Sequence, residues 1–478
     1  MSMNHPTAPD AGPAVSPTGF DEPAAGGPRV LIIVQNLPVP LDRRVWLECL
    51  ALKENGYSVS VICPKGPGDP ARQVIDGIAI YKYRPAPDAK GLGGFVVEFV
   101  YSWLRTAALS IRVRRERGFD VIQACNPPDT YWALARLWRL RGAKFIFDQH
   151  DLNPELFLSR FGQPTTLGGK LQLRGLRWLE RMTYRTADRV ISTNESYKRL
   201  AITRGGKPAD HVTVVRSGPD TRAMRPVYPP ESIREGADHL LVYLGIMGPQ
   251  DGVDTILHVT DELVHRRGRT GLRVALLGFG DCLEDLKRQC TEMGLDENVV
   301  FTGRADKAMI ADYLSAADVG LCPDLKTPLN DVSTMNKTME YMAYALPSVS
   351  FDLVETRVSG ADTVTYVDSG DTMGFADAVE GLLEHPELRA DRGTAARERV
   401  SRSLDWRPQA DSYVGVFDEL TRRPSSAATQ APPTLPTPPD GRDFVDLDEV
   451  DEIRRFIKER SRPRVNEAVE PEPTTSVV

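Results

Sequence analysis

Lys337 and Glu340 lie three positions apart in the segment PLNDVSTMNKTMEYMA, which follows the apolar run DVGLCPD. This order predicts a strand, a loop of small polar residues and a helix that begins near Ser333 or Thr334. On such a helix the two charged side chains share one face. A lysine neutralises a diphosphate and a carboxylate accepts the hydroxyls of a ribose, so the pair indicates a clamp for a nucleotide sugar. The alternative is an ordinary surface ion pair, which contributes little to stability.

The elements that position this pair come from two series of apolar runs that alternate with helical stretches. The first series spans residues 29–225, and the second spans residues 238–405 after the proline-rich connector MRPVYPPESIREG. Continuous apolar runs are typical of buried parallel strands, so we expect an α/β fold with two doubly wound, Rossmann-like domains. Ligands of such sheets bind beyond the carboxyl ends of the strands, and we expect the two domains to face a cleft there.

Three segments lie outside these two series. Residues 1–28 are rich in Pro, Ala and Gly and have no Lys or Arg, so we expect a disordered lead and no signal peptide. Residues 406–422 predict a helix that crosses back to the first domain. Residues 423–478 begin with a Pro-rich linker and continue as an acidic tail, so we expect this part to be flexible.

The acidic tail contains four apolar residues at helical spacing: Leu447, Val450, Ile453 and Ile457. Acidic residues come first in this stretch and basic residues last, which suits the helix dipole. The pattern predicts a short amphipathic helix that docks on a surface, with a protein partner as one expected occupant. The alternative is a helix that is largely unfolded when alone.

Composition and charge limit the class of protein. Residues 29–225 carry 32 Lys and Arg against 18 Asp and Glu, a net charge of +14, whereas residues 226–478 carry 27 against 45, a net charge of −18. This asymmetry indicates different partners for the two halves. The six cysteines lie in or beside apolar runs without C-x-x-C spacing, which favours buried, reduced thiols and a cytoplasmic location. The lack of a long uncharged apolar run predicts no transmembrane helix.

Two glycine-rich turns of the second domain are candidates for binding an anion. Gly245 and Gly248 lie in YLGIMGPQDGVDTIL, and Gly278 and Gly280 lie in LLGFGD. Such turns let backbone N–H groups approach a phosphate, and the helix that follows adds partial positive charge. Neither turn is a complete G-x-G-x-x-G fingerprint or a P-loop, so we expect a phosphorylated ligand other than a classical dinucleotide.

The segment NKTMEYMAYALPSVSFD resembles the donor-site block of glycosyltransferase family 4, which comprises retaining enzymes of the GT-B architecture. FTGR at residues 301–304 and RSGPD at residues 216–220 resemble two further segments of that family, so the resemblance covers roughly residues 29–420. It implies that Lys337 meets the donor phosphates and that Glu340 meets the ribose hydroxyls. The donor-binding residues expected from it are Gly245, Gly248, Arg304, Asp331, Asn336, Lys337 and Glu340.

Four positions depart from the family pattern. Val332 stands where a glutamate is usual, and Ser217 stands where an asparagine is usual. Ile246 and Asp251 lie near the places of the usual arginine and lysine of the phosphate clasp. These departures resemble a subgroup of bacterial surface-polysaccharide enzymes, and they also fit a chain that binds a nucleotide sugar without turning it over.

Seven polar residues follow strands of the first domain: Arg43, Arg44, Asn126, Asp129, His150, Asp151 and Glu155. The resemblance implies that His150 polarises or orients the reacting sugar, which makes it catalytic together with Lys337 and Glu340. We expect the other six to line the acceptor site. Structural alternatives stay open for some of them: a local Asp42–Arg pair for the two arginines, a structural role for His150, and prolines in QACNPPD that only shape the loop.

The expected chemistry needs no metal ion and no cofactor. No His, Cys and Asp cluster has metal-ligand spacing, and no D-x-D segment lies in a strand-end loop. Lys337, backbone N–H groups and a helix N-terminus are then expected to stabilise the leaving group. We see no nucleophile that matches the carboxylate pair of a retaining hydrolase, so attack on the front face, as proposed for the family, is expected.

A basic amphipathic helix is predicted in GGKLQLRGLRWLERMTYRTAD. Its basic residues fall in one narrow stripe: Lys170, Arg174, Arg177, Arg181 and Arg185. Leu171, Trp178, Leu179 and Met182 lie to one side of that stripe, which suits an anionic membrane surface. The alternative is a core helix with a solvated basic face. Nucleic acid is not an expected partner, because no recognised binding motif accompanies the charge.

These features together predict a cytoplasmic glycosyltransferase attached peripherally to the inner face of the plasma membrane. It is expected to move a hexosyl or N-acetylhexosaminyl group from a nucleotide-sugar donor to a glycan or lipid-linked acceptor, in the synthesis of cell-surface polysaccharide or glycolipid. Two alternatives stay open, namely a non-hydrolysing nucleotide-sugar epimerase and a non-catalytic scaffold that binds nucleotide sugar.

Overall fold

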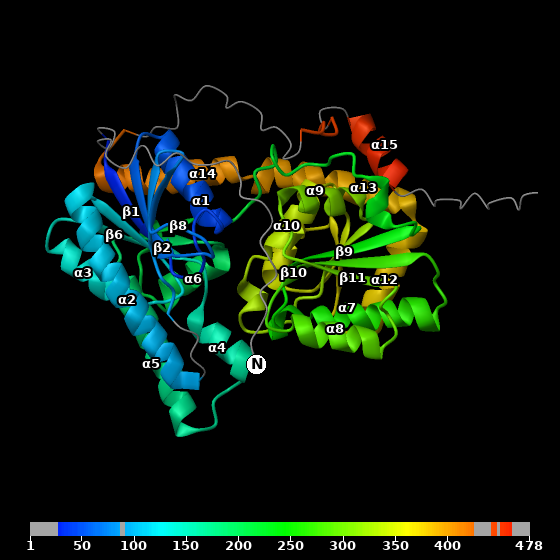
Figure 1. Cartoon of the computed structure of the whole chain (residues 1–478), viewed down its shortest axis with the longest axis horizontal. Coiled ribbons are helices and arrows are strands. Elements are labelled where there is room, and N and C mark those ends of the chain that lie inside the picture. Colours follow the sequence, from blue (N-terminus) through cyan, green and yellow to red (C-terminus); the bar gives the residue numbers. More distant parts are fainter. Residues whose placement is uncertain (1–26, 87–90, 425–440, 447–449, 461–478) are drawn as a thin grey trace, which may run out of the picture. The chain divides into compact units, whose positions relative to one another are not determined.

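The computed structural model describes residues 27–86, 91–424, 441–446 and 450–460 (Figure 1). The predicted lead up to residue 26, the predicted linker at 425–440 and Leu447 lie outside the described residues. The chain divides into two compact units. Of the described residues, the first unit comprises 27–86, 91–154, 165–215 and 410–424, and the second comprises 155–164, 216–409, 441–446 and 450–460.

The first unit contains an eight-stranded sheet in the order β3-β4-β2-β1-β5-β6-β7-β8. Its strands are β1 Arg29–Ile33, β2 Ser58–Pro64, β3 Arg72–Ile75, β4 Ile78–Tyr83, β5 Val121–Cys125, β6 Lys144–Gln149, β7 Arg189–Ser192 and β8 Val212–Val214. All neighbours are parallel except β3, which pairs antiparallel with β4 at the edge. The helices are α1 Arg43–Glu54, α2 Gly91–Glu116, α3 Trp132–Arg139, α5 Leu167–Thr186 and α6 Glu195–Thr203, with a short 3-10 turn η1 Ala209–His211. Two further helices are divided between the units: α4 Asn153–Phe161 has all but its first two residues in the second unit, and α14 Trp406–Thr421 enters the first unit at residue 410.

Helices cover both faces of this sheet, because alternate strand residues point to opposite sides. Helices α2, α3 and α5 lie side by side on one face (Figure 1). There the indole of Trp138 on α3 donates to Ser110 on α2, and the rings of Trp132 and Trp178 connect α3 to α5. On the other face Tyr413 of α14 donates a hydrogen bond to Gln123 of β5.

The second unit contains a six-stranded, fully parallel sheet in the order β11-β10-β9-β12-β13-β14. Its strands are β9 His239–Ile246, β10 Leu272–Phe279, β11 Val299–Gly303, β12 Val319–Cys322, β13 Ser348–Phe351 and β14 Val364–Val367. Its α-helices are α7 Val253–Asp261, α8 Leu283–Glu292, α9 Lys307–Ala316, α10 Asn336–Ala343, α11 Val354–Gly360, α12 Thr372–Glu384, α13 Pro386–Arg399 and α15 Val450–Arg460. Shorter 3-10 and π segments are η2 Glu231–Arg234, η3 Pro249–Asp251, η4 Glu262–Arg266, η5 Asn330–Val332 and η6 Val400–Leu404.

The predicted fold class is confirmed, because each unit is an α/β unit whose sheet is parallel, apart from the edge strand β3, and whose apolar strand residues are buried. The start of α10 was predicted too early. The helix begins at Asn336, and the hydroxyl of Ser333 donates to the carbonyl of Leu329 at 2.8 Å and so takes part in the preceding loop. Met335 occupies the N-cap position without a side-chain cap, so the capping signal in the sequence belongs to the loop.

The described part of the chain also bears on two predictions from composition. None of the helices in it combines the length and the apolar character that a membrane-spanning segment requires. All six cysteines lie in it as free thiols, five of them buried and Cys282 half-buried.

Candidate functional site

Lys337 lies in the first turn of α10, and its side chain is buried. Its ammonium Nζ lies 2.5 Å from Oδ1 of Asp324, which follows β12 and is 1% exposed. Nζ also lies 5.1 Å above the centre of the Tyr243 ring. Burial alone would lower the pKa of Lys337, but the neighbouring Asp324 carboxylate raises it, so the buried side chain stays positively charged.

Gly245 and Gly278, predicted to lie in glycine-rich turns, are paired residues near the carboxyl ends of the strands β9 and β10, beside this lysine. A Cβ atom on Gly245 would lie 3.1 Å from Cε of Lys337, and one on Gly278 would lie 1.8 Å from the carbonyl oxygen of Gly245. A Cβ atom on Gly280 would lie 2.5 Å from the carbonyl oxygen of Met247. The ends of β9 and β10 and the residues that follow them therefore pack backbone against backbone, and only glycine permits this approach.

Asp251 takes part in the first glycine turn. Its Oδ2 accepts a hydrogen bond from the backbone N–H of Gly248 at 2.8 Å. Burial raises the pKa of Asp251 to about 6, and the positive charge of Lys337 opposes this rise. The position near that of the usual basic residue thus carries a carboxylate, and this carboxylate binds one of the N–H groups of the turn.

The other predicted donor residues differ in their surroundings. Glu340 is buried one turn after Lys337 on α10, whereas Asn336 is exposed. Arg304 is also exposed, and its guanidinium lies over the ring of Phe279 at the end of β10. Asp331 accepts from the backbone N–H of Val354 at 3.0 Å and so supports the start of α11.

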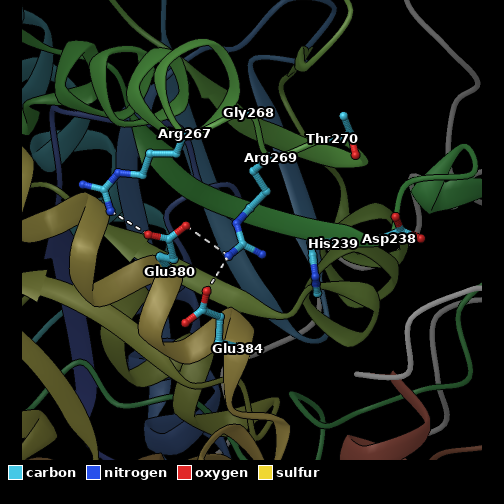
Figure 2. Close-up of a pocket in the computed structure, with 8 residues that line it drawn as sticks. All are labelled: Asp238, His239, Arg267, Gly268, Arg269, Thr270, Glu380 and Glu384. Atoms are coloured by element: carbon cyan, nitrogen blue, oxygen red, sulfur yellow. Dashed lines mark hydrogen bonds and ion pairs between the residues drawn. The ribbon is translucent and has the colours of Figure 1, made fainter.

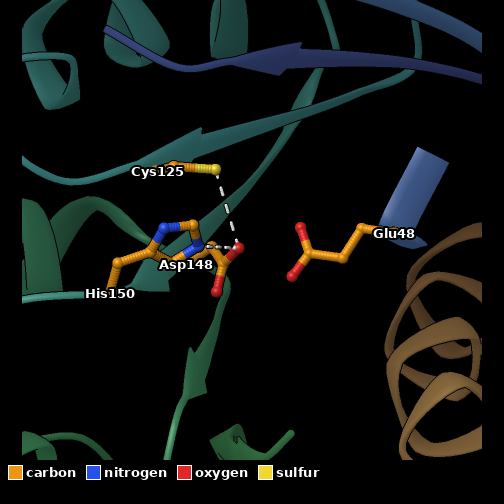
Figure 3. Close-up of side chains that lie close together, drawn as sticks. All are labelled: Glu48, Cys125, Asp148 and His150. Atoms are coloured by element: carbon orange, nitrogen blue, oxygen red, sulfur yellow. Dashed lines mark hydrogen bonds and ion pairs between the residues drawn. The ribbon is translucent and has the colours of Figure 1, made fainter. Parts of the chain in front are cut away.

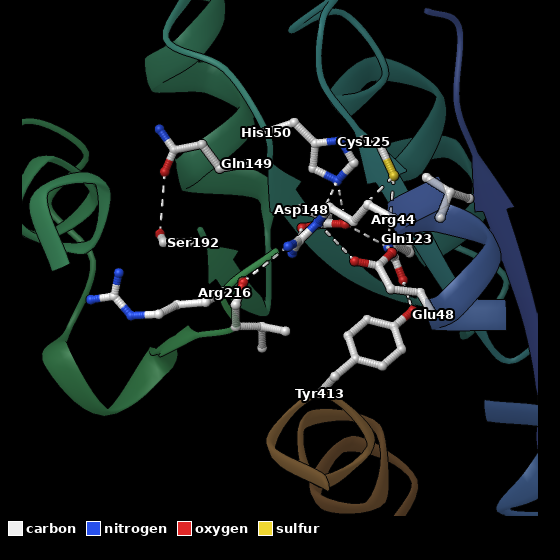
Figure 4. A network of polar contacts seen from close by, with 12 residues as sticks. Arg44, Glu48, Gln123, Cys125, Asp148, Gln149, His150, Ser192, Arg216 and Tyr413 are labelled. Atoms are coloured by element: carbon white, nitrogen blue, oxygen red, sulfur yellow. Dashed lines mark hydrogen bonds and ion pairs between the residues drawn. The ribbon is translucent and has the colours of Figure 1, made fainter. Parts of the chain in front are cut away.

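In the first unit, His150 belongs to a buried polar network (Figure 4). Its Nε2 lies 2.8 Å from Oδ2 of Asp148 on β6. Arg44 on α1 pairs with Asp148 at 3.2 Å and with Glu48 at 2.9 Å, and it donates to the carbonyl of Val215 at 3.0 Å. Arg44, predicted to meet a substrate, therefore holds the network together in this structure.

Charges in this network are strongly shifted. Burial would lower the pKa of His150, but the Asp148 carboxylate raises it to about 8. Burial disfavours the charged form of Asp148, yet His150 and Arg44 hold its pKa well below the usual range. Burial, followed by the charge of Asp148, raises the pKa of Glu48 to about 8. The Asp148 carboxylate therefore favours the imidazolium form of His150, while Nε of Arg44 also lies 3.2 Å from the same Nε2.

Four side chains of this network lie close enough to hold a metal ion, namely Glu48, Cys125, Asp148 and His150 (Figure 3). Their candidate ligand atoms lie within 4.8 Å of one another. They lie on α1, β5, β6 and the loop after β6, so they form no recognisable metal-binding motif in the sequence. Both carboxylates already contact the guanidinium of Arg44, and the amide of Gln123 donates to each of them at 2.8 Å. The guanidinium of Arg44 thus supplies positive charge beside the acidic groups that a metal ion would otherwise contact. Metal-independent chemistry stays a prediction.

Asn126 links the predicted acceptor residues that follow β5 and β6. Its Oδ1 accepts from the backbone N–H groups of His150 and Asp151 at 2.7 and 3.1 Å. Its Nδ2 donates to Oδ1 of Asp129, a buried carboxylate whose pKa burial raises to about 6. Asn153 donates to the other oxygen of Asp129. These side chains fix the loop that carries His150.

Two predicted acceptor residues lie outside this cluster. Arg43 is the first residue of α1, with an exposed side chain. Glu155 lies in the first turn of α4, after the boundary that assigns it to the second unit. Sequence reasoning missed Asp148, Glu48 and Asp324 as partners of the candidate residues. The signal was present, since each is an acid in or directly after an apolar run, KFIFDQ, VWLECLAL and VGLCPD.

A separate cavity of about 460 Å³ lies at the opposite, amino end of β9, beside His239 (Figure 2). Its arginines and glutamates neutralise one another. Arg267 pairs with Glu380 at 2.7 Å, and Arg269 pairs with Glu380 and Glu384 at 3.1 Å. The donor candidates lie at the carboxyl ends of the strands, so this cavity is not part of the candidate site.

Two family models match the chain. The "glycosyl transferase 4-like domain" matches residues 41–218, and "glycosyl transferases group 1" matches residues 238–385. The alpha-D-kanosaminyltransferase of Streptomyces kanamyceticus is 25% identical over 65% of this chain and 79% of that protein. The D-inositol 3-phosphate glycosyltransferase 2 of Catenulispora acidiphila is 26% identical over 82% of this chain and 90% of that protein.

Solved structures share the fold at low sequence identity. A sucrose-phosphate synthase from Thermosynechococcus elongatus has a TM-score of 0.66 and 17% identity, covering 83% of this chain and 100% of that chain. The Anabaena protein HepE, in complex with UDP-glucose, has a TM-score of 0.61 and 14% identity, covering 82% of this chain and 99% of that chain.

Proposed function

Since the chain belongs to the family 4 glycosyltransferases with the GT-B fold, we propose that it transfers a hexosyl or N-acetylhexosaminyl group from a nucleotide sugar to a glycan or lipid-linked acceptor. In this proposal the configuration at the anomeric carbon is retained, and the product belongs to a cell-surface polysaccharide or glycolipid. The observation that carries the proposal is the buried, charged Lys337 in the first turn of α10, with Glu340 one turn later.

On the donor side, Lys337 supplies positive charge where a diphosphate leaving group needs it. A buried ammonium acts in a low-dielectric site, where charge stabilisation is stronger than in water. The N-terminus of α10 adds partial positive charge to the same position. Glu340, on the same helix, accepts the ribose hydroxyls of the nucleotide.

On the acceptor side, His150 orients the reacting sugar. Its Nε2–H is held by Asp148, which fixes the ring and keeps it protonated at neutral pH. The second ring nitrogen, Nδ1, then acts as a hydrogen-bond donor to a sugar hydroxyl. Asn126 holds the backbone of His150 and Asp151, so the loop is fixed before substrate binds.

In the proposed reaction, the bond between the anomeric carbon and the donor phosphate oxygen breaks. The acceptor oxygen forms its bond on the same face, and its proton passes to the departing diphosphate. Lys337 and the helix N-terminus offset the negative charge that develops on the leaving group, so this step needs no metal ion.

We also propose that the enzyme acts as a peripheral protein on the cytoplasmic face of a membrane. Helix α5 exposes the five basic residues of its stripe together with Leu167, Leu171 and Trp178, which are 85%, 68% and 53% exposed. Beside it α2 exposes Val97 and Leu104, which are 61% and 57% exposed. Apolar side chains beside arginines on a helix suit the interface of an anionic bilayer.

The proposal is tested by incubating the purified protein with UDP-, GDP- and TDP-sugars, with and without EDTA and a membrane lipid extract. We expect release of nucleoside diphosphate that requires the extract and survives EDTA. Conversion of the donor without any acceptor would show the epimerase alternative instead. Binding of a nucleotide sugar without turnover under all conditions would show the scaffold alternative instead. This outcome is worth measuring, because Asp251 places a carboxylate near the position of a usual basic residue of the phosphate clasp.

A further inference from the structure

Helix α15 of the C-terminal tail packs on the second unit of its own chain, beside α13 (Figure 1). Its apolar residues Ile453, Phe456 and Ile457 are buried in one cluster with Ala345 and Ala390. Of the four residues predicted to dock on a partner, Ile453 and Ile457 are therefore buried against the rest of their own chain. Burial of three large apolar side chains stabilises this contact.

A short segment before α15 pairs with residues 225–227, which precede the first strand of the second sheet. Phe444 forms an antiparallel bridge with Val227, and the N–H of Val445 donates to the carbonyl of Pro226 at 3.0 Å. Arg225 donates in return to the carbonyl of Val445 at 2.7 Å. The tail is thus held by backbone pairing as well as by apolar packing.

Arg460, the last residue of α15, reaches the carboxyl end of the donor helix α10. Its guanidinium is buried and donates to the carbonyls of Tyr344 and Ala345 at 3.4 and 3.0 Å. Tyr344 is the C-cap of α10, and the last carbonyls of a helix have no partner within it. A cation at this end also offsets the helix dipole.

The carboxyl end of α10 needs this support. Ala345 adopts a left-handed conformation, with φ of 51°, which is unfavourable for a residue other than glycine. Its carbonyl oxygen lies so close to Gly393 that a Cβ atom there would approach it to 2.3 Å. Arg397 of α13 donates to the carbonyl of Ala343 at 2.7 Å, so two arginines bind successive carbonyls of this end.

The docked position of Arg460 is also electrostatically unfavourable. Burial, together with the nearby Arg234 and Arg389, lowers the pKa of Arg460, and Asp318 offsets this only in part. The carbonyl of Arg460 accepts from Arg234 at 2.7 Å, which ties the end of α15 in place. Attachment is thus a balance between apolar packing with matched hydrogen bonds and the burial of like charges.

We propose that α15 is an intramolecular clasp and that Arg460 is a positioning residue, which holds α10 so that Lys337 and Glu340 bind the nucleotide-sugar donor. Helix α10 has eight residues, so its two ends are only about 12 Å apart, and a shift at its carboxyl end is expected to reach Lys337 in its first turn. Release of the clasp loosens the carboxyl end of α10 and weakens donor binding. The donor part of this inference rests on the proposed function.

The test compares full-length Arg460→Gln with Arg455→Gln, which removes an exposed arginine from the same helix. Hydrogen exchange is followed at the amides of Tyr344, Ala345 and Leu346, whose hydrogen bonds close the end of α10. Binding of UDP, GDP and TDP is measured by calorimetry. We expect faster exchange at these amides and at least about fivefold weaker nucleotide binding for Arg460→Gln, with neither change in Arg455→Gln.

Arg460→Lys keeps the charge but not the forked geometry, and we expect it to restore part of both properties. Hydrogen exchange at the same three amides that is as slow in Arg460→Gln as in the wild type would overturn the proposal that α15 acts as a clasp. Faster exchange with unchanged nucleotide affinity would overturn the coupling to donor binding. If the wild type bound no nucleotide, the proposed function would fail, while the exchange comparison would still decide whether Arg460 holds α10.

Discussion

At the scale of single residues, the ion pair between Lys337 and Asp324 is the feature of the donor side that depends most on both partners being present. Asp324 is 1% exposed, and its Oδ1 lies 2.5 Å from the ammonium. A buried pair of this kind contributes little net stability, but the loss of one partner leaves an unpaired buried charge. The stability of the second unit should therefore depend strongly on both residues being present.

Asp324→Asn should lower the free energy of unfolding by about 3 kcal/mol, because it leaves Lys337 charged and unpaired. The double variant Asp324→Asn, Lys337→Met should recover part of this loss. Denaturant titration measures both values, with Asp377→Asn as a control, since Asp377 has a side chain that is 68% exposed. Equal stabilities for Asp324→Asn and Asp377→Asn would show that the buried pair does not form.

The pH dependence of stability tests the network around His150, which faces Asp148, Arg44 and Glu48. The folded-state pKa of His150 is about 8 against an ordinary value of 6.5, so protonation favours the folded state. This contribution, about 2 kcal/mol, is fully present below pH 6.5 and is lost as the pH rises through 8. The stability difference between wild type and His150→Gln should therefore be larger at pH 6 than at pH 9. A difference independent of pH would mean that Asp148 does not stabilise the imidazolium.

At the scale of elements, the strands could be predicted from the sequence, whereas the residues that contact the candidate site residues could not. Apolar runs such as RVLII and RVALLGF predict buried parallel strands, because a parallel strand covered by helices on both faces buries consecutive residues. Asp148 lies within such a run, so the sequence pattern predicts only that it belongs to a strand and does not indicate a role in the site. Its contact with Arg44, on a helix about a hundred residues earlier, depends on the order of strands in the sheet, which spacing does not encode.

Helix α5 should act as a membrane-contacting element. Arg174→Glu, Arg177→Glu and Arg181→Glu together should reduce binding to vesicles that contain anionic lipid by at least tenfold, since each basic residue near the surface contributes about 1 kcal/mol. Lys287→Glu and Arg288→Glu on α8, which are also exposed, serve as the control. Cosedimentation with vesicles measures both. Unchanged binding of the α5 variant would assign this basic face to solvent.

At the scale of the whole molecule, each sheet presents its candidate residues at the carboxyl ends of its strands. In one unit Gly245 lies near the end of β9 and Asp324 follows β12, and in the other unit Asn126 follows β5 and His150 follows β6. This arrangement agrees with the rule for ligand sites in open parallel sheets, so their general location could be predicted from the strand pattern. The tail shows the opposite case. Its helical spacing was visible in the sequence, but its docking site on α10 and α13 was not, because it depends on a surface built from distant segments.

The most direct measurement is release of nucleoside diphosphate from the preferred donor, in the presence of lipid extract and EDTA, by the wild type, Lys337→Ala and Lys307→Ala. Lys307 is an exposed lysine at the start of α9 and controls for the loss of a positive charge in the same unit. We expect Lys337→Ala to lose at least about 100-fold in turnover, because it removes the cation that stabilises the leaving group, while Lys307→Ala stays active. Full turnover by Lys337→Ala would contradict the assignment of Lys337 to the donor diphosphate.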